Sequence, residues 1–390
     1  MIYLDNNAST KLDEEVAAAM GEAAELFGNP SSVHAEGRRA RRAIEGARDE
    51  VACLVGARPE EIFFTSGGTE ANALAVFGAT ATRPGRVVFT AAEHPSVRGA
   101  VDCVARDPAY ESVAVSPEPS GALDAEKLLS AVIPATALVS VMAANNEYGG
   151  LYPLAQLAPE IRRRGAIFHT DAVQAAGRIA VEVRGWGVDL ASFSAHKLHG
   201  PKGVGALFVR KGVSLQAHTP GGGQEKRVRA GTENTIGIVG FGVAARLARE
   251  RGVRESVSIS ALRDRFEREV CARIADAEVV GAQAPRLPNT SAILFRGVSG
   301  EGLLIRLDLE DVAVSVGAAC SSGTLSPSPA ILSLGFALSD ARSVVRFSFS
   351  RLTTEQEVSR VLEMLPRFVA EARRIGAEAP ADAFAGTARP

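Results

Sequence analysis

The sequence has few lysines and no long apolar segment. Six of its 43 basic residues are lysine and the remaining 37 are arginine (43 − 6 = 37). Arginine stays protonated and is no nucleophile, so each lysine is a candidate for amine chemistry. No apolar run reaches the roughly 18 residues that span a bilayer. The first residues, MIYLDNNAST, lack a basic region followed by an apolar stretch. We therefore expect a cytoplasmic protein with no membrane partner.

Cysteine is also scarce. The four cysteines, Cys53, Cys103, Cys271 and Cys320, lie far apart, and no two of them form a CxxC pair. This spacing argues against a self-contained zinc site and against a disulfide framework. Three of the four lie among apolar and small residues, which predicts buried, inert thiols; the surroundings of Cys320 differ. The formal net charge of −2 gives no general attraction to nucleic acid, and we expect no such partner.

Short β-rich runs alternate with helical patterns along the first two thirds of the 390 residues. This alternation predicts crossover connections and a mainly parallel sheet with helices on both faces. The expected strands are 62–65, 86–90, 137–142, 166–170, 189–193 and 204–209. The expected helices are 36–55, 69–81, 95–106, 124–132 and 153–164.

The pattern changes after Gly231. A long helical stretch over 233–273, broken near Gly252, is followed by strands at 291–295, 312–316 and 344–350 and by helices at 300–309 and 354–373. This order predicts a smaller α+β unit. We predict a large α/β domain over 14–250, a small α+β domain formed by 1–13 and 251–377, and a disordered Ala/Pro-rich tail over 378–390.

The first chemical motif is the run SGGTEANAL, which begins at Ser66 and follows an expected strand. A strand, then glycines, then a helix start brings backbone amides together at the positive end of a helix dipole, where they bind anions. Gly68 and Thr69 would donate to a phosphate. The alternative is a glycine turn that only begins a helix. No P-loop lysine follows, which argues against an NTPase.

The second motif, HTDAVQAAG, places Asp171 at the carboxyl end of an expected parallel strand, where open α/β sheets bind ligands. Asp171 could pair with a protonated pyridine nitrogen and so keep a cofactor ring electron-poor. Gln174, on the same face of a following helix, could hydrogen-bond the ring hydroxyl. Alternatively, Asp171 only caps that helix.

The third motif, SFSAHKLHGPKG, places Lys197 directly after another strand, beside donors from Ser194 and His196. A lysine in such a site can have a lowered pKa and act as a nucleophile and proton carrier. An exposed loop lysine is the alternative. The order of phosphate turn, acid and lysine describes a site for pyridoxal 5'-phosphate (PLP) in a fold-type I enzyme.

The sequence, with these motifs in this order, resembles the class V aminotransferases and, within them, the cysteine desulfurases of the NifS and IscS type. The resemblance extends from YLDNNAST near the start to FSFSRLTTEQE near residue 350. Further matching runs are NPSSVHAEGR, FTSGGTEAN, EHPSV, ANNEYG, HTDAVQ, SAHKLHGPKG, GGGQE and AGTEN. It implies an α/β fold-type I PLP transferase with a mainly parallel seven-stranded sheet and a smaller α+β domain.

The resemblance also implies roles for individual residues. His94 would stack on the cofactor ring and help to move protons, and Asn146 would contact cofactor or substrate. Ser194 and His196 would join Gly68 and Thr69 at the phosphate. Thr232 would reach the phosphate of a partner subunit, which implies a homodimer. Arg346 would bind the carboxylate of L-cysteine, a task that its planar guanidinium suits.

Cys320 lies in VSVGAACSSGTLSP, where these enzymes carry the cysteine that accepts sulfur. Small residues and serines around it predict an exposed loop; an ordinary free cysteine is the alternative. The resemblance predicts no metal in the enzyme, although Cys320 could serve as a transient iron–sulfur ligand. The chain departs from the family at SVGAAC, where SSGSAC is more usual, at Tyr152, where glutamine is usual, and at Ala73, where asparagine is common.

The function implied is conversion of L-cysteine to L-alanine, with sulfur transferred to Cys320 as a persulfide. The persulfide would pass to an acceptor protein for iron–sulfur cluster assembly or thio-modification. The tail lacks the scaffold-docking sequence of housekeeping members, so the acceptor stays open. Two other functions are a PLP enzyme of different chemistry, such as an aminotransferase or a selenocysteine or cysteine-sulfinate lyase, and a sulfur carrier without cofactor.

Overall fold

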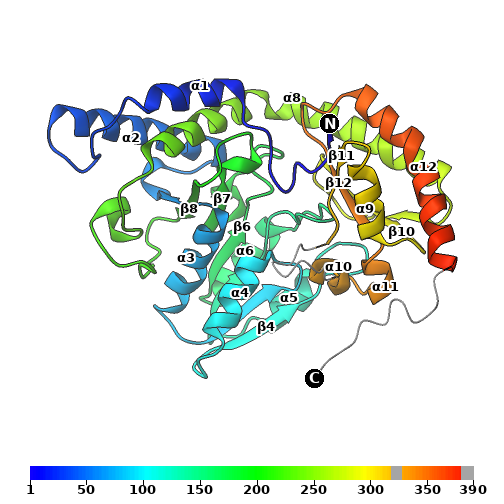
Figure 1. Cartoon of the computed structure of the whole chain (residues 1–390). Coiled ribbons are helices and arrows are strands. Elements are labelled where there is room, and N and C mark those ends of the chain that lie inside the picture. Colours follow the sequence, from blue (N-terminus) through cyan, green and yellow to red (C-terminus); the bar gives the residue numbers. More distant parts are fainter. Residues whose placement is uncertain (318–326, 379–390) are drawn as a thin grey trace.

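A computed structural model describes residues 1–317 and 327–378 of the chain. Its largest feature is a seven-stranded sheet with helices on both faces (Figure 1). The strand order is β2-β8-β7-β6-β5-β3-β4, and β8 runs antiparallel to both of its neighbours, whereas β7, β6, β5, β3 and β4 are parallel. The prediction of a mainly parallel seven-stranded sheet is therefore confirmed. The strands are β2 (Ile62–Thr65), β3 (Arg86–Thr90), β4 (Glu111–Val115), β5 (Thr136–Ser140), β6 (Ile167–Asp171), β7 (Leu190–Ser194) and β8 (Gly205–Val209).

The central strands are buried on both faces because helices cover both. All residues of β5, β7 and β8 are buried, as expected for strands between two helical layers. Successive side chains enter opposite cores: Leu190 packs with α3 and α4, and Ala191 packs with α2, α6 and α8. The helices of this part are α1 (Glu14–Ala23), α2 (Ala35–Val55), α3 (Gly68–Thr80), α4 (Pro95–Val104), α5 (Ala125–Ala131), α6 (Leu154–Arg163) and α7 (Val183–Trp186).

A smaller antiparallel sheet of order β12-β10-β9 forms the second part of the molecule. Its core is rich in phenylalanine, and the ring of Phe266 contacts the rings of both Phe347 and Phe349. A parallel pair, β1 and β11, lies beside it and joins the N-terminus to this part. The elements are β1 (Ile2–Tyr3), β9 (Ala277–Val279), β10 (Thr290–Phe295), β11 (Val312–Ala313), β12 (Val344–Ser348), α9 (Gly300–Asp308), α10 (Pro329–Ser333), α11 (Leu338–Ala341) and α12 (Glu355–Glu378).

One long helix, α8 (Thr235–Arg273), connects the two parts (Figure 1). Phe241 belongs to the core of the large sheet, and Phe266 belongs to the core of the small sheet. The expected break near Gly252 is wrong, since the helix continues through this residue. Packing at both ends outweighs the weak helix propensity of one glycine. The predicted domain boundaries stay a prediction.

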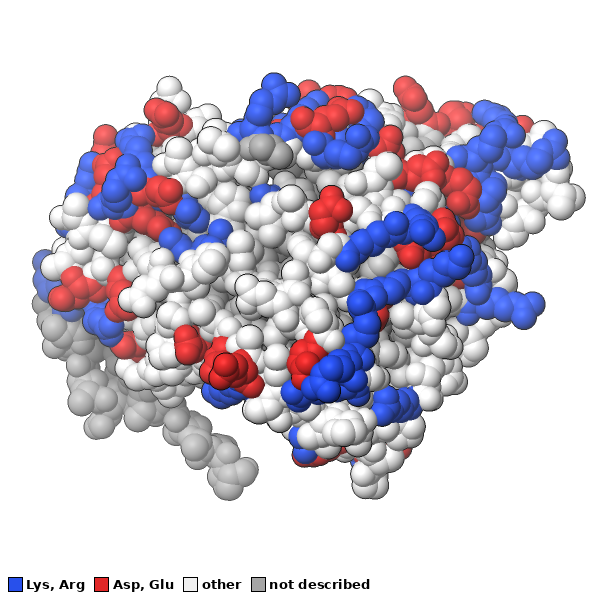
Figure 2. Space-filling model, turned by 180° about the vertical axis from the view of Figure 1, so that it is seen from behind, with Lys and Arg blue, Asp and Glu red and all other residues white. Residues whose placement is uncertain are grey.

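Several other expectations need correction. The strand expected over 312–316 ends at Ala313, although Ser315 still bridges to Arg346. α12 continues to Glu378, whereas the expected helix ended at 373; the tail 379–390 lies outside the described residues. Over the described ranges, no helix combines the length and apolarity needed to cross a membrane. In Figure 2, positive and negative side chains form mixed clusters between uncharged areas, in keeping with the near-zero net charge.

Candidate active site

The turn after β2 packs tightly against the ends of neighbouring strands. Gly67 has a φ of +155° and precedes α3, and no described side chain caps the first turn of that helix. A Cβ on Gly68 would lie 2.8 Å from Cγ2 of Val173 and 3.5 Å from Cβ of Ser194. A Cβ on Gly205 would lie 2.7 Å from Gly67. The glycines are therefore needed for close packing, and the uncapped amides of α3 can receive an anion.

Lys197 ends a short 3₁₀ turn (Ala195–Lys197) directly after β7. Its Nζ donates to the backbone carbonyl of Asn7 and, at 2.8 Å, to that of Ala8. Burial lowers the pKa of Lys197 to about 7; the charges of Arg178 and Arg346 act in the same direction, while nearby carboxylates oppose them. A large share of the amine is thus neutral near pH 7. The alternative of an exposed loop lysine is wrong.

Asp171 ends β6 and is 5% exposed. Its Oδ2 accepts a 2.7 Å hydrogen bond from Nδ2 of Asn72, and its Oδ1 accepts the backbone N–H of Val173 at 3.0 Å. No α-helix follows Asp171, because residues 173–178 form turns, so the helix-cap alternative is wrong. Asn72 lies on α3 and was missed from the sequence. The sequence did offer one indication: Asn72 lies four residues after Gly68, and this spacing places both residues on the same face of the helix.

His94 and Gln174 flank the same region. The pKa of His94 is lowered by burial, with Asp171 opposing the shift and Lys197 adding to it. The charges of both residues therefore act on the imidazole, whose Nδ1 lies 2.7 Å from Oγ of Ser96. Nε2 of Gln174 donates at 3.0 Å to the carbonyl of Asn7, the same acceptor that Lys197 uses. The expected helix under Gln174 is replaced by a turn.

Arg346 lies on β12 and is 8% exposed, although reasoning from the strand alone would place it on the surface. One guanidinium nitrogen donates to Asp5 at 2.7 Å, and another donates at 3.0 Å to the carbonyl of Asn146. Nε of Arg346 is buried and has no hydrogen-bond partner among the described residues. A buried donor without a partner is costly, and a ligand carboxylate would satisfy it.

Ser194 directly precedes the 3₁₀ turn that carries Lys197, and His196 lies within that turn. Ser194 is buried at the end of β7. Nδ1 of His196 lies 3.2 Å from Oγ of Ser9, and burial, followed by the charge of Lys197, lowers the pKa of His196 to about 4. The ring is therefore neutral at pH 7 and can donate one hydrogen bond. Thr232 is exposed, and no described hydrogen bond joins it to the other candidate residues.

Comparison with known proteins agrees with this arrangement. The profile of the aminotransferase class-V family matches residues 2–361. The chain belongs to this family. A cysteine desulfurase of Cereibacter sphaeroides is 44% identical over 378 residues, which cover 96% of this chain and 97% of that protein. A NifS-like protein structure is 32% identical with a TM-score of 0.89, covering 95% of this chain and 99% of that one. A structure of SspA in complex with cysteine is 29% identical with a TM-score of 0.80, covering 91% and 100%.

Class-V aminotransferases and the related cysteine desulfurases use PLP, and the residues of this site fit that cofactor. An amine with a lowered pKa, a buried carboxylate and an uncapped helix start lie at the ends of β7, β6 and β2. Oδ1 of Asn72 is also buried without a described partner. Strand ends of this kind form the ligand-binding edge of open α/β sheets.

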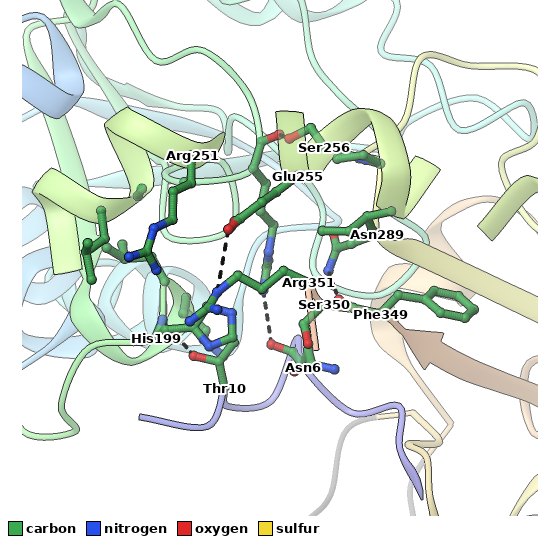
Figure 3. A pocket seen from close by; sticks show the side chains of 18 of the residues that line it. Asn6, Thr10, His199, Arg251, Glu255, Ser256, Asn289, Phe349, Ser350 and Arg351 are labelled. Atoms are coloured by element: carbon green, nitrogen blue, oxygen red, sulfur yellow. Dashed lines mark hydrogen bonds and ion pairs between the residues drawn. The ribbon is translucent and has the colours of Figure 1, made fainter. Parts of the chain in front are cut away.

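A small cavity of about 50 Å³ has Lys197 in its lining, and Figure 3 shows other residues that line it. Its lining includes Arg178, Arg251 and Arg351, and none of Gly68, His94 and Asp171. Ion pairs join Arg351 to Asp13 and, at 3.7 Å, to Glu255. A volume of this size suits water and is far below the roughly 300 Å³ of a small-molecule pocket. The cavity lies between α8, the N-terminal segment and the loop after β12.

The exposure of the cysteines differs from the prediction. Cys53, Cys103 and Cys271 are exposed, so the prediction of buried thiols is wrong. Each lies on a helix with small neighbours, and composition alone could not tell the outer face from the inner one. Cys320 lies outside the described residues, and its role stays a prediction.

Proposed function

We propose that this class-V aminotransferase family member is a PLP-dependent cysteine desulfurase. It converts L-cysteine to L-alanine and places the sulfur on Cys320. The single observation that carries the proposal is the placement of Lys197 directly after β7, with Asp171 at the end of the neighbouring β6; the lowered pKa of the amine agrees with this placement. Relatives named cysteine desulfurase, which match nearly the whole chain, support the choice of substrate.

We propose the cofactor contacts that the motifs and the family resemblance imply. Gly68, Thr69, Ser194 and His196 would hold the phosphate, Asp171 the ring nitrogen, Gln174 the ring hydroxyl and Lys197 the aldehyde carbon. PLP supplies an electron sink that stabilises negative charge at the substrate α-carbon. Asn72 and the backbone N–H of Val173 fix both oxygens of Asp171 in place. The carboxylate therefore reaches the ring already oriented.

Lys197 and His94 would move protons. The neutral amine of Lys197 accepts the proton from the α-carbon of the substrate, and a pKa near 7 lets it release that proton again at neutral pH. His94 is held at Nδ1 by Ser96, which orients its ring. Burial disfavours its charged form, so a neutral imidazole faces the cofactor and assists proton movement.

Arg346 and Asn146 would bind the substrate. The unpartnered Nε of Arg346 is a donor for the carboxylate of L-cysteine. The guanidinium is held in place by Asp5 and by the carbonyl of Asn146. The remaining donor, Nε, is therefore held in a fixed orientation for the substrate carboxylate.

Sulfur transfer is proposed to end on Cys320. The thiolate sulfur bonds to the substrate sulfur while the carbon–sulfur bond breaks, and its electron pair stays with the carbon skeleton, which gains a proton as alanine forms. The net change is L-cysteine plus a thiol giving L-alanine plus a persulfide. On both sides of residues 318–326, described residues contact the proposed substrate-binding region. Ser315 pairs with Arg346 through two backbone hydrogen bonds, and Ser328 hydrogen-bonds Glu147.

A homodimer is proposed, with Thr232 lent to the partner's site. Phe27 and Val33 are large apolar side chains that are 81% and 88% exposed, and they would become buried in an interface. Arg41 ties their loop to the Thr232 segment, because it donates to the carbonyl of Pro30 and pairs with Glu233 at 2.7 Å. Arg41 thus joins the loop that carries Phe27 and Val33 to the segment that carries Thr232, and a second copy would cover both segments.

The persulfide is proposed to pass to a separate acceptor protein in the cytoplasm, for iron–sulfur cluster assembly or thio-modification.

The test of the function uses purified protein loaded with PLP and incubated with L-cysteine and a thiol reductant. We expect alanine and sulfide in equal amounts. Formation of a 2-oxo acid without sulfide would contradict the proposal and favour transamination.

A further inference from the structure

The loop over 221–234 adopts an unfavourable backbone that other residues hold in place. Glu225, Lys226 and Arg227 have φ angles of +42°, +54° and +67°, a left-handed conformation that non-glycine residues avoid. Three such residues in succession persist only where the surrounding structure imposes them. The loop is therefore built to a fixed shape.

The first anchor is Glu225, whose side chain is almost fully buried. Arg48 donates to both of its carboxylate oxygens at 2.8 Å, and the backbone N–H of Phe64 donates to it at 2.8 Å. Arg48 also donates to the carbonyl of Ile62 at 2.7 Å. Ile62 and Phe64 belong to β2. This strand leads into the turn over residues 66–69, the phosphate turn, so the loop is tied to the segment before that turn.

The second anchor is Arg229, which ties the loop to the segment after the turn. Its Nε donates to Oε1 of Glu70 at 2.8 Å, and a second nitrogen lies 3.3 Å from Oε2. The same carboxylate accepts the backbone N–H of Ser66 within the phosphate turn. Gly231 follows Arg229 by two residues in the chain, so a fixed Arg229 also limits the position of Gly231. Arg229 thus lies between the phosphate turn and the next part of the loop.

That next part is the exposed pair Gly231 and Thr232. Gly231 has a φ of +105°, and its N–H donates at 3.2 Å to Oε1 of Gln224, which closes the loop. Glu233 is buried and pairs with Arg41 on α2. The residues on both sides of the pair are therefore fixed, while Thr232 itself is presented outward.

We propose that Arg229 is a positioning residue for the cofactor phosphate in both subunits of the dimer. Through Glu70 it orders the phosphate turn of its own chain, and through Gly231 it orders the threonine that this chain lends to its partner. The proposal rests on the proposed function, in which Thr232 reaches the partner's phosphate. It follows that a change at Glu70, within one chain's turn, weakens PLP binding in the other chain.

The test uses mixed dimers assembled from two differently tagged chains. One chain carries Lys197→Ala and cannot be labelled, so PLP fixed to Lys197 by borohydride and counted by mass spectrometry reports only the other chain. Arg229→Gln is placed either in the labelled chain, where it reports its effect on its own turn, or in the unlabelled chain, where it reports its effect through Thr232. The PLP concentration for half-maximal labelling is measured in each arrangement.

We expect that concentration to rise about three- to tenfold in both arrangements, as for loss of a partly exposed charged hydrogen bond. Arg86→Gln is the matched control, because it removes a similar two-bond pair with Glu111 at a distant edge, and it should change neither value. A rise in one arrangement only, or in neither, overturns the proposal.

Glu70→Gln in the unlabelled chain is the second variant, and it decides the matter if Arg229→Gln chains do not form dimers. We expect the same rise in the labelled chain. An unchanged value overturns the proposal, since Glu70 has no other described route to the partner's site. Failure of the proposed function is seen separately, as absence of label on Lys197 in the intact dimer, and it contradicts both.

Discussion

The side-chain amide of Asn72 donates a 2.7 Å hydrogen bond to Oδ2 of Asp171, and both side chains are buried. The same nitrogen donates to Oγ of Ser96 at 2.9 Å, and Ser96 in turn contacts His94. One asparagine on α3 therefore connects the carboxylate proposed for the ring nitrogen with the imidazole proposed to stack on the ring. This connection sets the orientation of both groups before the cofactor binds.

Replacing Asn72 with alanine should weaken PLP binding about tenfold, because Asp171 loses the donor that orients it and keeps a buried oxygen without a partner. The dissociation constant is measured by titrating apoprotein with PLP and following absorbance. Ser96→Ala separates the two roles of the Asn72 amide, because it leaves the bond to Asp171 and removes only the support of His94, so it should weaken PLP binding less than Asn72→Ala does. An Asn72→Ala protein with unchanged affinity would show that Asp171 needs no such support.

Lys197 should be far more reactive at neutral pH than an ordinary lysine. Burial holds its pKa at about 7, so the neutral, nucleophilic fraction rises with pH through that value. In apoprotein, acetylation of Lys197 counted by mass spectrometry should reach half its limiting rate near pH 7. A lysine model peptide, with a pKa of about 10.4, is the reference. A midpoint close to that of the peptide would contradict the proposed electrostatics.

Lys197→Arg should retain no activity, because arginine restores a positive charge without a nucleophile. Lys197→Ala should behave in the same way, which shows that the amine itself is required. Alanine formation from L-cysteine is the measurement. Turnover in the arginine variant above that of the alanine variant would contradict the assignment of Lys197.

Glu93 should make stability depend on pH. It is almost fully buried; burial, followed by the charge of Asp171, raises its pKa to about 8. The folded state therefore binds more protons than the unfolded state between the ordinary pKa of 4.5 and about 8. The free energy of unfolding contributed by this group falls as pH rises across that window.

Glu93→Gln mimics the protonated carboxyl and should remove this loss. Its thermal midpoint relative to the unsubstituted apoprotein should increase between about pH 5 and about pH 8 and then level off. Glu111→Gln, at an exposed edge position, serves as the control for a general charge effect. A difference in midpoint that does not vary with pH would show that Glu93 is ionised in the folded protein.

Much of the architecture could be predicted from the sequence, because strands buried on both faces give continuous apolar runs and the three chemical motifs each follow such a strand. Lys197, Asp171 and Gly68 were found in this way. The course of α8 was not, because the break at Gly252 was predicted from local propensity, whereas packing at Phe241 and Phe266 decides it.

The supporting residues of the site were harder to predict. Asn72 contacts Asp171 across about 100 residues of sequence, and Asp5 contacts Arg346 across more than 300, so both contacts arise only from the tertiary structure. Arg178 is similar: it is buried against the carbonyls of Asn6 and Gln174, and it helps to lower the pKa of Lys197. No periodicity in the sequence indicates such contacts. The prediction that three cysteines are buried failed for a related reason, because small neighbouring residues do not reveal which face of a helix is covered.

The dimer arrangement can be tested by complementation. Chains with Lys197→Ala are mixed with chains with Thr232→Ala, and exchange is confirmed by mass spectrometry. Half of the sites in a mixed dimer carry both lesions, and the other half carry neither, if Thr232 serves the partner's site. We expect desulfurase activity well above that of either parent. Activity that stays at the parents' level despite exchange would place Thr232 in the site of its own chain.

The central claim is that sulfur from L-cysteine reaches Cys320. Protein loaded with PLP is incubated briefly with L-cysteine without reductant, alkylated, digested and examined by mass spectrometry. The peptide containing Cys320 should gain one sulfur atom, and Cys103→Ser, which removes a different and exposed thiol, should leave that gain unchanged. Cys320→Ser should still bind PLP yet form little alanine, with a loss of roughly 10³-fold or more. Near-normal alanine from Cys320→Ser, or the extra sulfur on another cysteine, would contradict the account.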